Sequence, residues 1–228
     1  MSNQYIHQNQ PLLTYGTDLK NAQAVVVMLH GRGSTAQSML SLAAELPQEG
    51  ITYLAPQAAN QTWYPNSGFI PIEANEPYVT SAFQTVSGLL EKISAAGIPH
   101  HKIVIGGFSQ GACLAAEFVA RHPQRYGGLF ALSGALLGSP DIPRQYRGSL
   151  EGTPVFVAGS DHDPWVTETQ LRLTGTVLGE MGGTVHTAIQ PGTDHTIRQT
   201  EIDHVSKMII NSSLLPIRAD ETKAVNQP

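Results

Sequence analysis

Three short segments of the chain carry side chains that could do chemistry together. A serine, Ser109, lies between two glycines in the pentapeptide GFSQG. Farther along come two aspartates, Asp161 and Asp163, and then His195. A serine hydroxyl is a poor nucleophile unless a base lies within hydrogen-bond reach and a carboxylate orients that base. The order serine, aspartate, histidine therefore predicts nucleophilic catalysis, with Ser109 as the nucleophile and His195 as its base.

The elements on either side of Ser109 would hold it in an exposed position. Residues 102–106 (KIVIG) predict a buried strand, and residues 112–122 predict a helix. Strand, Gly-x-Ser-x-Gly and helix form the nucleophile elbow of α/β-hydrolases, whose tight turn leaves no room for bulk beside the serine. The turn lifts the serine oxygen above the sheet edge at a helix N-terminus. This context favours the elbow over an ordinary strand-to-helix turn.

Two aspartates compete for the role of the acid that orients His195. Asp161 and Asp163 both follow a predicted strand that ends at Ala158, and His195 follows the last predicted strand. In α/β-hydrolases the order along the chain is serine, acid, histidine, which holds for either aspartate. Asp194 is a weaker alternative, because a residue directly before His195 is badly placed to orient its ring. The residues alone leave Asp161 and Asp163 open.

The oxygen that becomes negative during attack needs N–H donors held in place beforehand. One donor in such sites is the backbone of the residue after the nucleophile, which here is Gln110. The other comes from the loop after an earlier strand. Residues 30–34 (HGRGS) form that loop, and its glycines let the backbone approach a ligand. The Arg32 N–H is the predicted second donor, and an ordinary tight turn is the alternative.

The remaining patterns predict how these segments come together. Apolar runs predict strands, and apolar residues at helical spacing predict the helices between them. Strands that alternate with helices favour a mostly parallel central sheet with helices on both faces, in which ligands bind at the carboxyl ends of the strands. Residues 56–76 have no clear period and predict a loop. The predicted strands are residues 24–29, 51–55, 102–106, 128–133, 154–158 and 184–189, and the predicted helices are residues 34–47, 77–97, 112–122, 165–181 and 197–210.

Length and composition exclude several classes of protein. A chain of 228 residues fits one α/β domain over residues 1–228, with an ordered core at about 11–215 and loose ends. A net charge of −5 without Lys/Arg clusters argues against nucleic acid or an anionic membrane as the main partner. With Cys113 as the single cysteine, no intrachain disulfide can form.

The chain also lacks the patterns that would place it in a membrane or around a metal. The N-terminus has no apolar segment of a secretory signal, and no apolar run approaches the roughly 18 residues of a membrane span. No His-Glu-x-x-His or close Cys/His pair predicts a metal. We therefore expect a cytoplasmic protein without a catalytic metal, whose oligomeric state, a homodimer included, the sequence leaves open.

Taken together, these motifs resemble the phospholipase/carboxylesterase family of the α/β-hydrolase superfamily. That family includes the acyl-protein thioesterases and small bacterial carboxylesterases. The resemblance extends roughly from Ala24 to Ile210. It implies an α/β-hydrolase fold with no large lid domain, and a reaction that needs no cofactor. The segments that carry the resemblance are Leu29–Gly33, Trp63, Gly106–Gly111, Asp163–Val166 and His195.

Carried over by position, the resemblance also implies individual roles. It selects Asp163 over Asp161 as the acid, because the family's acid is followed by a proline and then a valine at the matching spacing. The roles that it implies are Ser109 as nucleophile, Asp163 as acid, His195 as base, and the backbones of Arg32 and Gln110 as oxyanion donors.

Two departures from the family pattern bear on the substrate. Thioesterases of the family usually carry Trp-Phe-Asp where this chain has Trp63-Tyr64-Pro65, and an apolar residue where it has Arg32. Both changes fall near the expected acyl pocket, so they favour a generic carboxylic ester hydrolase over long-chain protein deacylation. The loop aromatics Trp63 and Tyr64, together with Phe69 and Ile70, are predicted to line the pocket; covering the core is the alternative.

The sequence therefore predicts a serine hydrolase that cleaves small-molecule carboxylic esters of short to medium acyl chain through an acyl-enzyme. The nearest alternative is an acyl-thioesterase or lysophospholipase, which would use the same residues. A non-catalytic ligand-binding protein on a hydrolase scaffold is a remote alternative, because the chain keeps all three members of the predicted triad.

Overall fold

A seven-stranded sheet forms the centre of the computed structural model, which describes residues 5–214. The strand order is β1-β3-β2-β4-β5-β6-β7, and every neighbouring pair is parallel except β1 with β3. The strands are β1 (Leu12–Gly16), β2 (Ala24–Leu29), β3 (Ile51–Pro56), β4 (Ile103–Phe108), β5 (Gly128–Leu132), β6 (Pro154–Ser160) and β7 (Thr184–Gln190). The α-helices are α1 (Ala36–Ala43), α2 (Tyr78–Ala95), α3 (Gln110–Arg121), α4 (Glu168–Glu180) and α5 (Gln199–Leu214).

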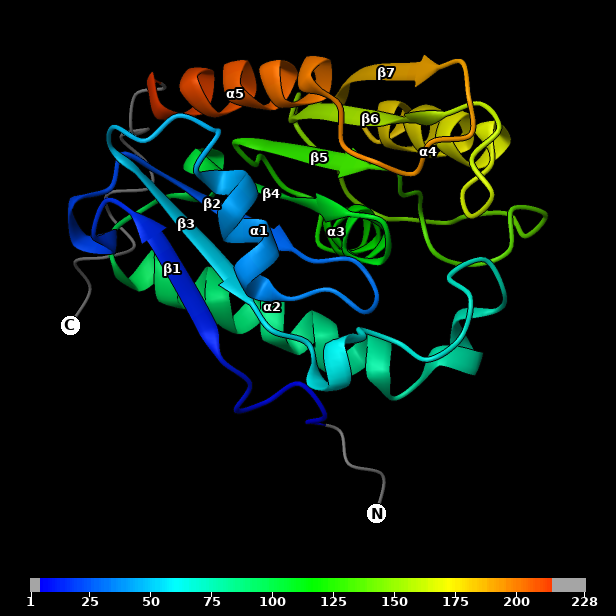
Figure 1. Ribbon diagram of the computed structural model, residues 1–228, viewed down its shortest axis with the longest axis horizontal. Coiled ribbons are helices and arrows are strands. Elements are labelled where there is room, and N and C mark those ends of the chain that lie inside the picture. The colour runs from blue at the N-terminus through cyan, green and yellow to red at the C-terminus, as the bar shows by residue number, and fades with distance from the viewer. Residues whose placement is uncertain (1–4, 215–228) are drawn as a thin grey trace.

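Helices cover both faces of the sheet (Figure 1), because each central strand buries its side chains in both directions. In β2, Val25 and Val27 belong to the core under α2, α3 and α4, whereas Val26 belongs to the core under α1 and α5. The predicted mostly parallel sheet with helices on both faces is confirmed, and every predicted strand occurs within a few residues of its expected bounds.

Helix starts differ from the prediction where capping side chains set them. Helix α1 is capped by Thr35, whose hydroxyl accepts from the Ser38 N–H, so the helix expected from residue 34 begins at Ala36. The helix expected from residue 165 begins at Glu168, because Thr167 and Gln170 form a capping box there. Residues 165–167 are thereby left in the loop that follows β6, at the carboxyl edge of the sheet.

The N-terminal part of the chain is more ordered than the sequence predicts. Strand β1, which the apolar patterns did not indicate, pairs antiparallel with β3 at the sheet edge and is mostly exposed. The core does not begin near residue 11: His7 is buried, and its ring nitrogens contact the Trp63 carbonyl and the Ala59 N–H. A fold that buries His7 against the loop after β3 ties down residues expected to be loose. The C-terminal end predicted to be loose lies outside the described residues.

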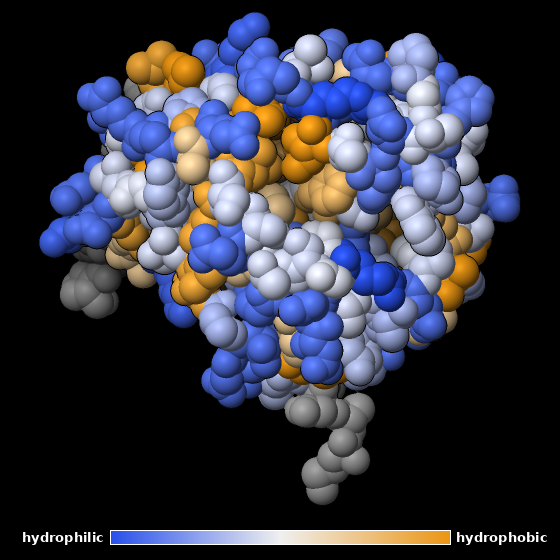
Figure 2. All heavy atoms as spheres, in the orientation of Figure 1, coloured by the Kyte–Doolittle hydropathy of each residue, from blue (hydrophilic) through white to orange (hydrophobic). Residues whose placement is uncertain are grey.

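The carboxyl edge of the sheet carries the long connections. Residues 57–77 form a loop with two short 3-10 helices, Ala59–Gln61 and Ile72–Asn75, and residues 133–153 connect β5 to β6. No large lid domain interrupts residues 5–214, and no helix within that range is long and apolar enough to cross a membrane. On the face that carries α1 and α5, hydrophobic residues are visible between the two helices, and most of the remaining surface is hydrophilic (Figure 2).

Candidate active site

Ser109 occupies the tight turn between β4 and α3. Its φ of 54° and ψ of −120° lie in a region that side-chain-bearing residues rarely adopt. A Cβ on Gly107 would lie 2.3 Å from the Leu29 carbonyl oxygen, and one on Gly111 would lie 2.1 Å from it. Both glycines are therefore required, because β2 passes directly against the turn. The predicted elbow geometry is present, with Ser109 at the start of a helix.

The structure brings Ser109, His195 and Asp163 into one hydrogen-bonded line. Ser109 Oγ lies 2.8 Å from His195 Nε2, and His195 Nδ1 lies 2.6 Å from Asp163 Oδ2. An ionised carboxylate only accepts, so Nδ1 carries the proton and Nε2 is free to accept from the serine. Asp163 is buried, and its other oxygen accepts from the backbone N–H groups of Trp165 and Val166 at 2.8 and 3.1 Å. The carboxylate is thereby fixed from both sides, as an orienting acid requires.

Asp161, the other candidate for the acid, makes different contacts. Asp161 Oδ1 accepts from the Gly192 N–H at 2.8 Å and contacts His162 Nδ1 at 2.6 Å. These hydrogen bonds lower the pKa of Asp161, and the carboxylate raises the pKa of His162. Asp161 therefore ties the loop that carries Asp163 to the loop that carries His195, and does not itself contact His195.

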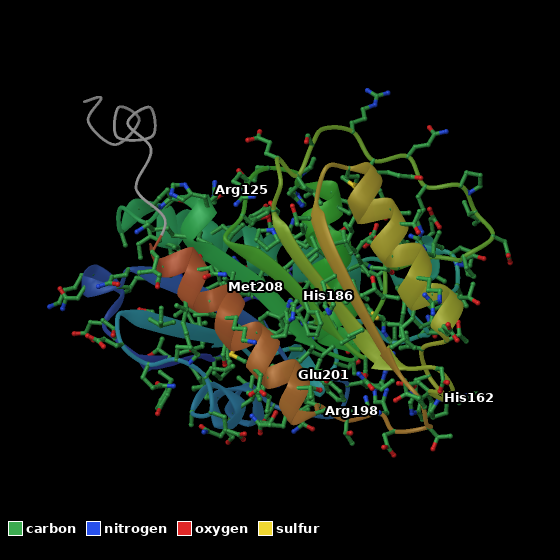
Figure 3. All side chains as sticks on the ribbon, turned by 90° about the horizontal axis from the view of Figure 1, so that it is seen from above. Arg125, His162, His186, Arg198, Glu201 and Met208 are labelled. Carbon is green, nitrogen blue, oxygen red and sulfur yellow. The ribbon has the colours of Figure 1, made fainter. Side chains whose placement is uncertain are left out.

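A second set of contacts fixes the His195 loop from the side of α5. The Ser160 hydroxyl donates to the Asp194 carbonyl oxygen at 2.5 Å, and an Arg198 nitrogen donates to Ser160 Oγ at 2.7 Å. Glu201, which is buried, accepts from Arg198. Figure 3 shows Arg198 and Glu201 at the start of α5, beside the loops after β6 and β7. Ser160 was not predicted from sequence, because a lone serine at a strand end gives no signal of its contacts.

The loop after β2 approaches Ser109 closely. A Cβ on Gly31 would lie 3.3 Å from a ring carbon of Phe108 and 3.4 Å from the Ser109 Cβ, so a larger residue would fit only with a small shift of Phe108. Among residues 5–214, no acceptor is bonded to the Arg32 backbone N–H. The side chain of Gln110 accepts from the Trp63 N–H and donates to the Tyr64 carbonyl. The oxyanion role of the Arg32 and Gln110 backbones remains a prediction, and this geometry is compatible with it.

A cavity of about 690 Å³ opens above Ser109 and His195. Tyr64 and Phe69 line it as predicted, but Trp63 and Ile70 do not. Trp63 is fully buried and donates from its indole nitrogen to the His30 carbonyl, so it belongs to the core beneath the loop. The cavity is lined by Gly31, Arg32, Ser34, Tyr64, Pro65, Asn66, Ser67, Gly68, Phe69, Phe108, Ser109, Gln110, Cys113, Trp165, Val166 and His195.

Hydrogen bonds from two side chains, Arg32 and Asn75, hold the cavity wall formed by residues 65–68. The Arg32 guanidinium donates to the carbonyls of Pro65 and Asn66. On the other side, the buried Asn75 accepts from the Asn66 N–H at 2.9 Å and donates to the Ser67 carbonyl at 2.8 Å. Sequence reasoning missed Asn75, because no local pattern relates it to the segment that it holds.

Cys113 lines the cavity, and its thiol is unreactive there. Burial raises the pKa of its thiol to about 11, and the pKa of the neighbouring Tyr64 is raised by burial as well. A thiol becomes a nucleophile only as a thiolate, so Cys113 is a lining group here.

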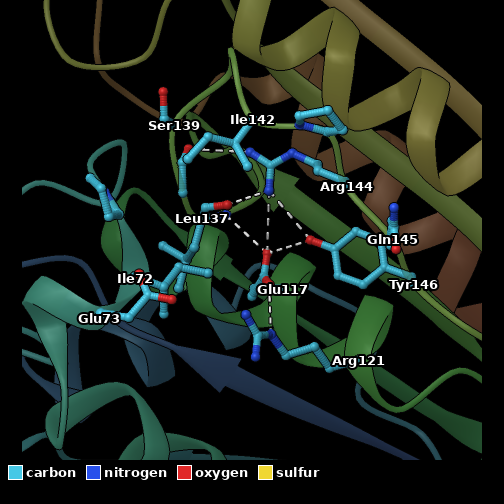
Figure 4. A pocket seen from close by; sticks show the side chains of 13 residues that line it. Ile72, Glu73, Glu117, Arg121, Leu137, Ser139, Ile142, Arg144, Gln145 and Tyr146 are labelled. Carbon is cyan, nitrogen blue, oxygen red and sulfur yellow. Dashed lines mark hydrogen bonds and ion pairs between the residues drawn. The ribbon is translucent and has the colours of Figure 1, made fainter.

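A second, smaller cavity of about 310 Å³ contains none of Ser109, Asp163 and His195. Its centre is Glu117, a fully buried carboxylate on α3 that Arg121, Arg144 and Tyr146 surround (Figure 4). Glu117 also accepts from the Leu137 N–H at 3.1 Å. These contacts tie the connection between β5 and β6 to the helix that follows Ser109. No cluster of metal-binding side chains occurs anywhere in residues 5–214.

Comparisons with known proteins show which family and fold the chain is similar to. Residues 17–213 match the profile of the family described as phospholipase/carboxylesterase. The chain is 28% identical over 214 residues to acyl-protein thioesterase 1 of Candida albicans, covering 84% of this chain and 93% of that protein. It is 26% identical over 216 residues to the acyl-protein thioesterase 1 of Debaryomyces hansenii.

Solved structures resemble it as well. The crystal structure of a phospholipase/carboxylesterase from Dyadobacter fermentans superposes with a TM-score of 0.84 at 38% identity, covering 89% of this chain and 97% of that one. The Bacillus cereus carboxylesterase superposes with a TM-score of 0.72 at 18% identity over 93% of this chain and 100% of its own length, which supports the fold alone.

Proposed function

Because the chain belongs to the phospholipase/carboxylesterase family, whose members are serine hydrolases of the α/β-hydrolase fold, we propose that it is a carboxylesterase for small esters of short to medium acyl chain. The observation that carries the proposal is the line from Ser109 through His195 to Asp163, which opens into the larger cavity. A serine, a base and a fixed acid in this geometry suit acyl transfer.

In the proposed first half-reaction, Ser109 Oγ attacks the ester carbonyl carbon while His195 Nε2 takes the hydroxyl proton. The carbonyl oxygen becomes an anion, and the backbone N–H groups of Arg32 and Gln110 donate to it. The carbon–oxygen bond to the alcohol then breaks, and His195 returns its proton to the leaving oxygen. The acyl group remains on Ser109 as an ester.

In the second half-reaction, a water molecule attacks the acyl-enzyme and His195 takes a proton from it. The oxyanion forms again at the same donors, and the bond to Ser109 Oγ breaks. His195 returns the proton to Ser109, and the carboxylic acid leaves. Throughout, Asp163 keeps the imidazole in one orientation and stabilises its charged form.

The wall formed by residues 65–68 supports the choice of acyl length. Arg32 and Asn75 hold this wall in place from both sides, so the acyl pocket has little freedom to widen for a long chain. Ester hydrolysis needs only a modest cavity, and the present one lies in the usual size range for small ligands.

Thioester hydrolysis is the second candidate function. It is favoured by the relatives named acyl-protein thioesterase 1, which match over most of this chain. The proposed chemistry would be unchanged, because a thiolate in place of an alkoxide would leave from the same position.

Hydrolysis of 4-nitrophenyl esters from acetate to palmitate, beside acyl thioesters of matched length, tests the proposal. We expect the greatest kcat/KM on short and medium esters, and its loss in Ser109→Ala with an unchanged far-UV circular dichroism spectrum. Undiminished activity in Ser109→Ala would remove the proposed nucleophile. A preference for long-chain thioesters would select the second candidate.

A further inference from the structure

One side of the larger cavity carries a large apolar side chain with nothing packed over it. Trp165 is 71% exposed, although it follows Asp163 by two residues and lines the cavity that contains Ser109 and His195. Its backbone is not loose, because its N–H donates to Asp163 Oδ1 at 2.8 Å. The acid that orients His195 thus also fixes the backbone that carries the indole.

The apolar surface around Trp165 continues to the base. Val166 lines the cavity next to it, and the ring of Phe108 lies 5.0 Å from the His195 ring, centroid to centroid. Phe108 is half-buried and precedes the nucleophile, so its position is set by the strained turn at Ser109. The side of the cavity beside His195 is therefore apolar and largely aromatic.

The rest of the lining differs in chemistry. It includes Arg32, Ser34, Asn66 and Ser67, which offer guanidinium, hydroxyl and amide groups, beside the aromatic rings of Tyr64 and Phe69. The cavity therefore combines an apolar region beside His195 with polar groups elsewhere in its lining.

The direction of the reaction assigns the parts. The oxygen that leaves must accept its proton from His195 Nε2, so the alcohol part of an ester lies on the His195 side. The acyl part then extends away from His195. The ring of Phe108 lies 5.0 Å from that of His195, and Trp165 and Val166 donate to the carboxylate that orients His195, so these three lining residues belong to the side of the alcohol part.

We propose that Trp165 and Phe108 form the binding site for the alcohol part of the substrate and select esters of flat, aromatic alcohols. This inference rests on the proposed function, because it presupposes that an ester is cleaved at Ser109. An exposed indole gives a flat ring a stacking surface that an aliphatic chain cannot use as well.

The test compares benzyl acetate with cyclohexylmethyl acetate, which share an acyl group and have similar leaving alcohols but differ in ring shape. In Trp165→Ala, kcat/KM for benzyl acetate should fall roughly three- to tenfold more than for cyclohexylmethyl acetate. Trp165→Phe should restore most of that difference. Ile142→Ala removes another exposed apolar side chain, at the second cavity, and should leave the ratio of the two substrates as in the wild type.

An equal fall for both acetates in Trp165→Ala, or no fall for either, would overturn the assignment of an aromatic alcohol. Either result leaves the proposed function standing, because the wild type still cleaves esters through Ser109. If the wild type cleaves neither acetate nor any 4-nitrophenyl ester, the proposed function itself fails.

Tryptophan fluorescence gives an independent readout. The chain has two tryptophans, and Trp63 is fully buried, so the exposed Trp165 should dominate any change on binding. Benzyl acetate added to Ser109→Ala should shift the emission to shorter wavelength as the ring covers the indole. The same shift in Ser109→Ala with Trp165→Phe, or no shift in Ser109→Ala itself, would contradict the proposal.

Discussion

The two walls of the active-site cavity are built by different means. Around Ser109 and His195, the chain is positioned by backbone geometry and by contacts between neighbouring loops, such as the bonds of Asp161 and Ser160 to the His195 loop. The wall at residues 65–68 depends instead on two side chains, Arg32 from the loop after β2 and Asn75 from the end of the wall's own loop. We infer that changes on the first side act on kcat, whereas changes on the second act on substrate binding.

The largest effect is expected from the acid. Asp163→Asn would favour the wrong tautomer of His195 and lower kcat by about 10⁴-fold. Asp161→Asn is the matched control. It makes the same chemical change two residues earlier in the chain, in a carboxylate that does not contact His195. Stopped-flow or steady-state kinetics on one short ester measures both. Similar losses in the two variants would contradict the assignment of Asp163.

The turn at Ser109 should tolerate no side chain at Gly111. In Gly111→Ala, the new Cβ would lie 2.1 Å from the Leu29 carbonyl oxygen, so we expect a loss of about 3 kcal/mol in the free energy of unfolding. Gly88→Ala is the control, because a Cβ there meets nothing within 4 Å and lies in helix α2. It should stabilise the protein by about 0.5–1 kcal/mol. Urea unfolding measures both, and equal stabilities would refute the packing argument.

Removal of the hydroxyl that holds the His195 loop should affect turnover more than binding. Ser160→Ala loses the bond to the Asp194 carbonyl and the bond from Arg198, so kcat should fall about tenfold, the equivalent of one to two lost hydrogen bonds, with little change in KM. Ser213→Ala removes a hydroxyl at the far end of α5 and serves as control. A rise in KM alone would place Ser160 with the pocket wall instead.

For the pocket wall, in contrast, we expect a change in KM with little change in kcat. Asn75→Ala frees the Asn66 N–H and the Ser67 carbonyl, so KM for a butyrate ester should rise about fivefold while kcat changes little. Asn75→Asp keeps the acceptor for Asn66 and loses the donor to Ser67, and should fall in between. A loss of kcat at constant KM would show that the two walls are not separable.

The smallest effect concerns the contact of Asp161 with His162, in which His162 is exposed and Asp161 is half-buried. Its stabilisation is fully present below the ordinary pKa of histidine, because the pKa of His162 is raised, and is lost as pH rises through that raised value. The pKa of Asp161 is lowered, so the contribution is lost again in acid. His162→Gln should therefore lower Tm slightly at pH 5.5 and less at pH 8.5. Scanning calorimetry measures the difference, and a larger effect at pH 8.5 would contradict it.

The same contrast between the walls explains how far the sequence predicts the site. Gly107, Ser109 and Gly111 form a local pattern whose meaning follows from one turn, and His195 follows from its place after a strand. Asp163 could be separated from Asp161 only by resemblance to a family, because both sit after the same strand. The structure supplies the reason, since only Asp163 points to His195.

The pocket wall could not be predicted in that way. Arg32 and Pro65 are separated by 33 residues, and their contact depends on how a loop without periodicity folds. Trp63 was expected to line the pocket, but an aromatic residue in a loop can equally cover the core. A hydrogen bond from its indole nitrogen to the His30 carbonyl places Trp63 in the core. In the fold, β1 was missed because an exposed edge strand need not carry an apolar pattern.

The central claim is that Ser109 is a nucleophile activated by His195. The most direct measurement is labelling with diethyl 4-nitrophenyl phosphate, in which the serine oxygen forms a bond to phosphorus and 4-nitrophenolate leaves. Intact-protein and peptide mass spectrometry should find one diethylphosphoryl group on Ser109, released nitrophenolate in equal amount, and matching loss of esterase activity. His195→Ala should label far more slowly. Labelling at another residue, or full activity in the labelled protein, would contradict the account.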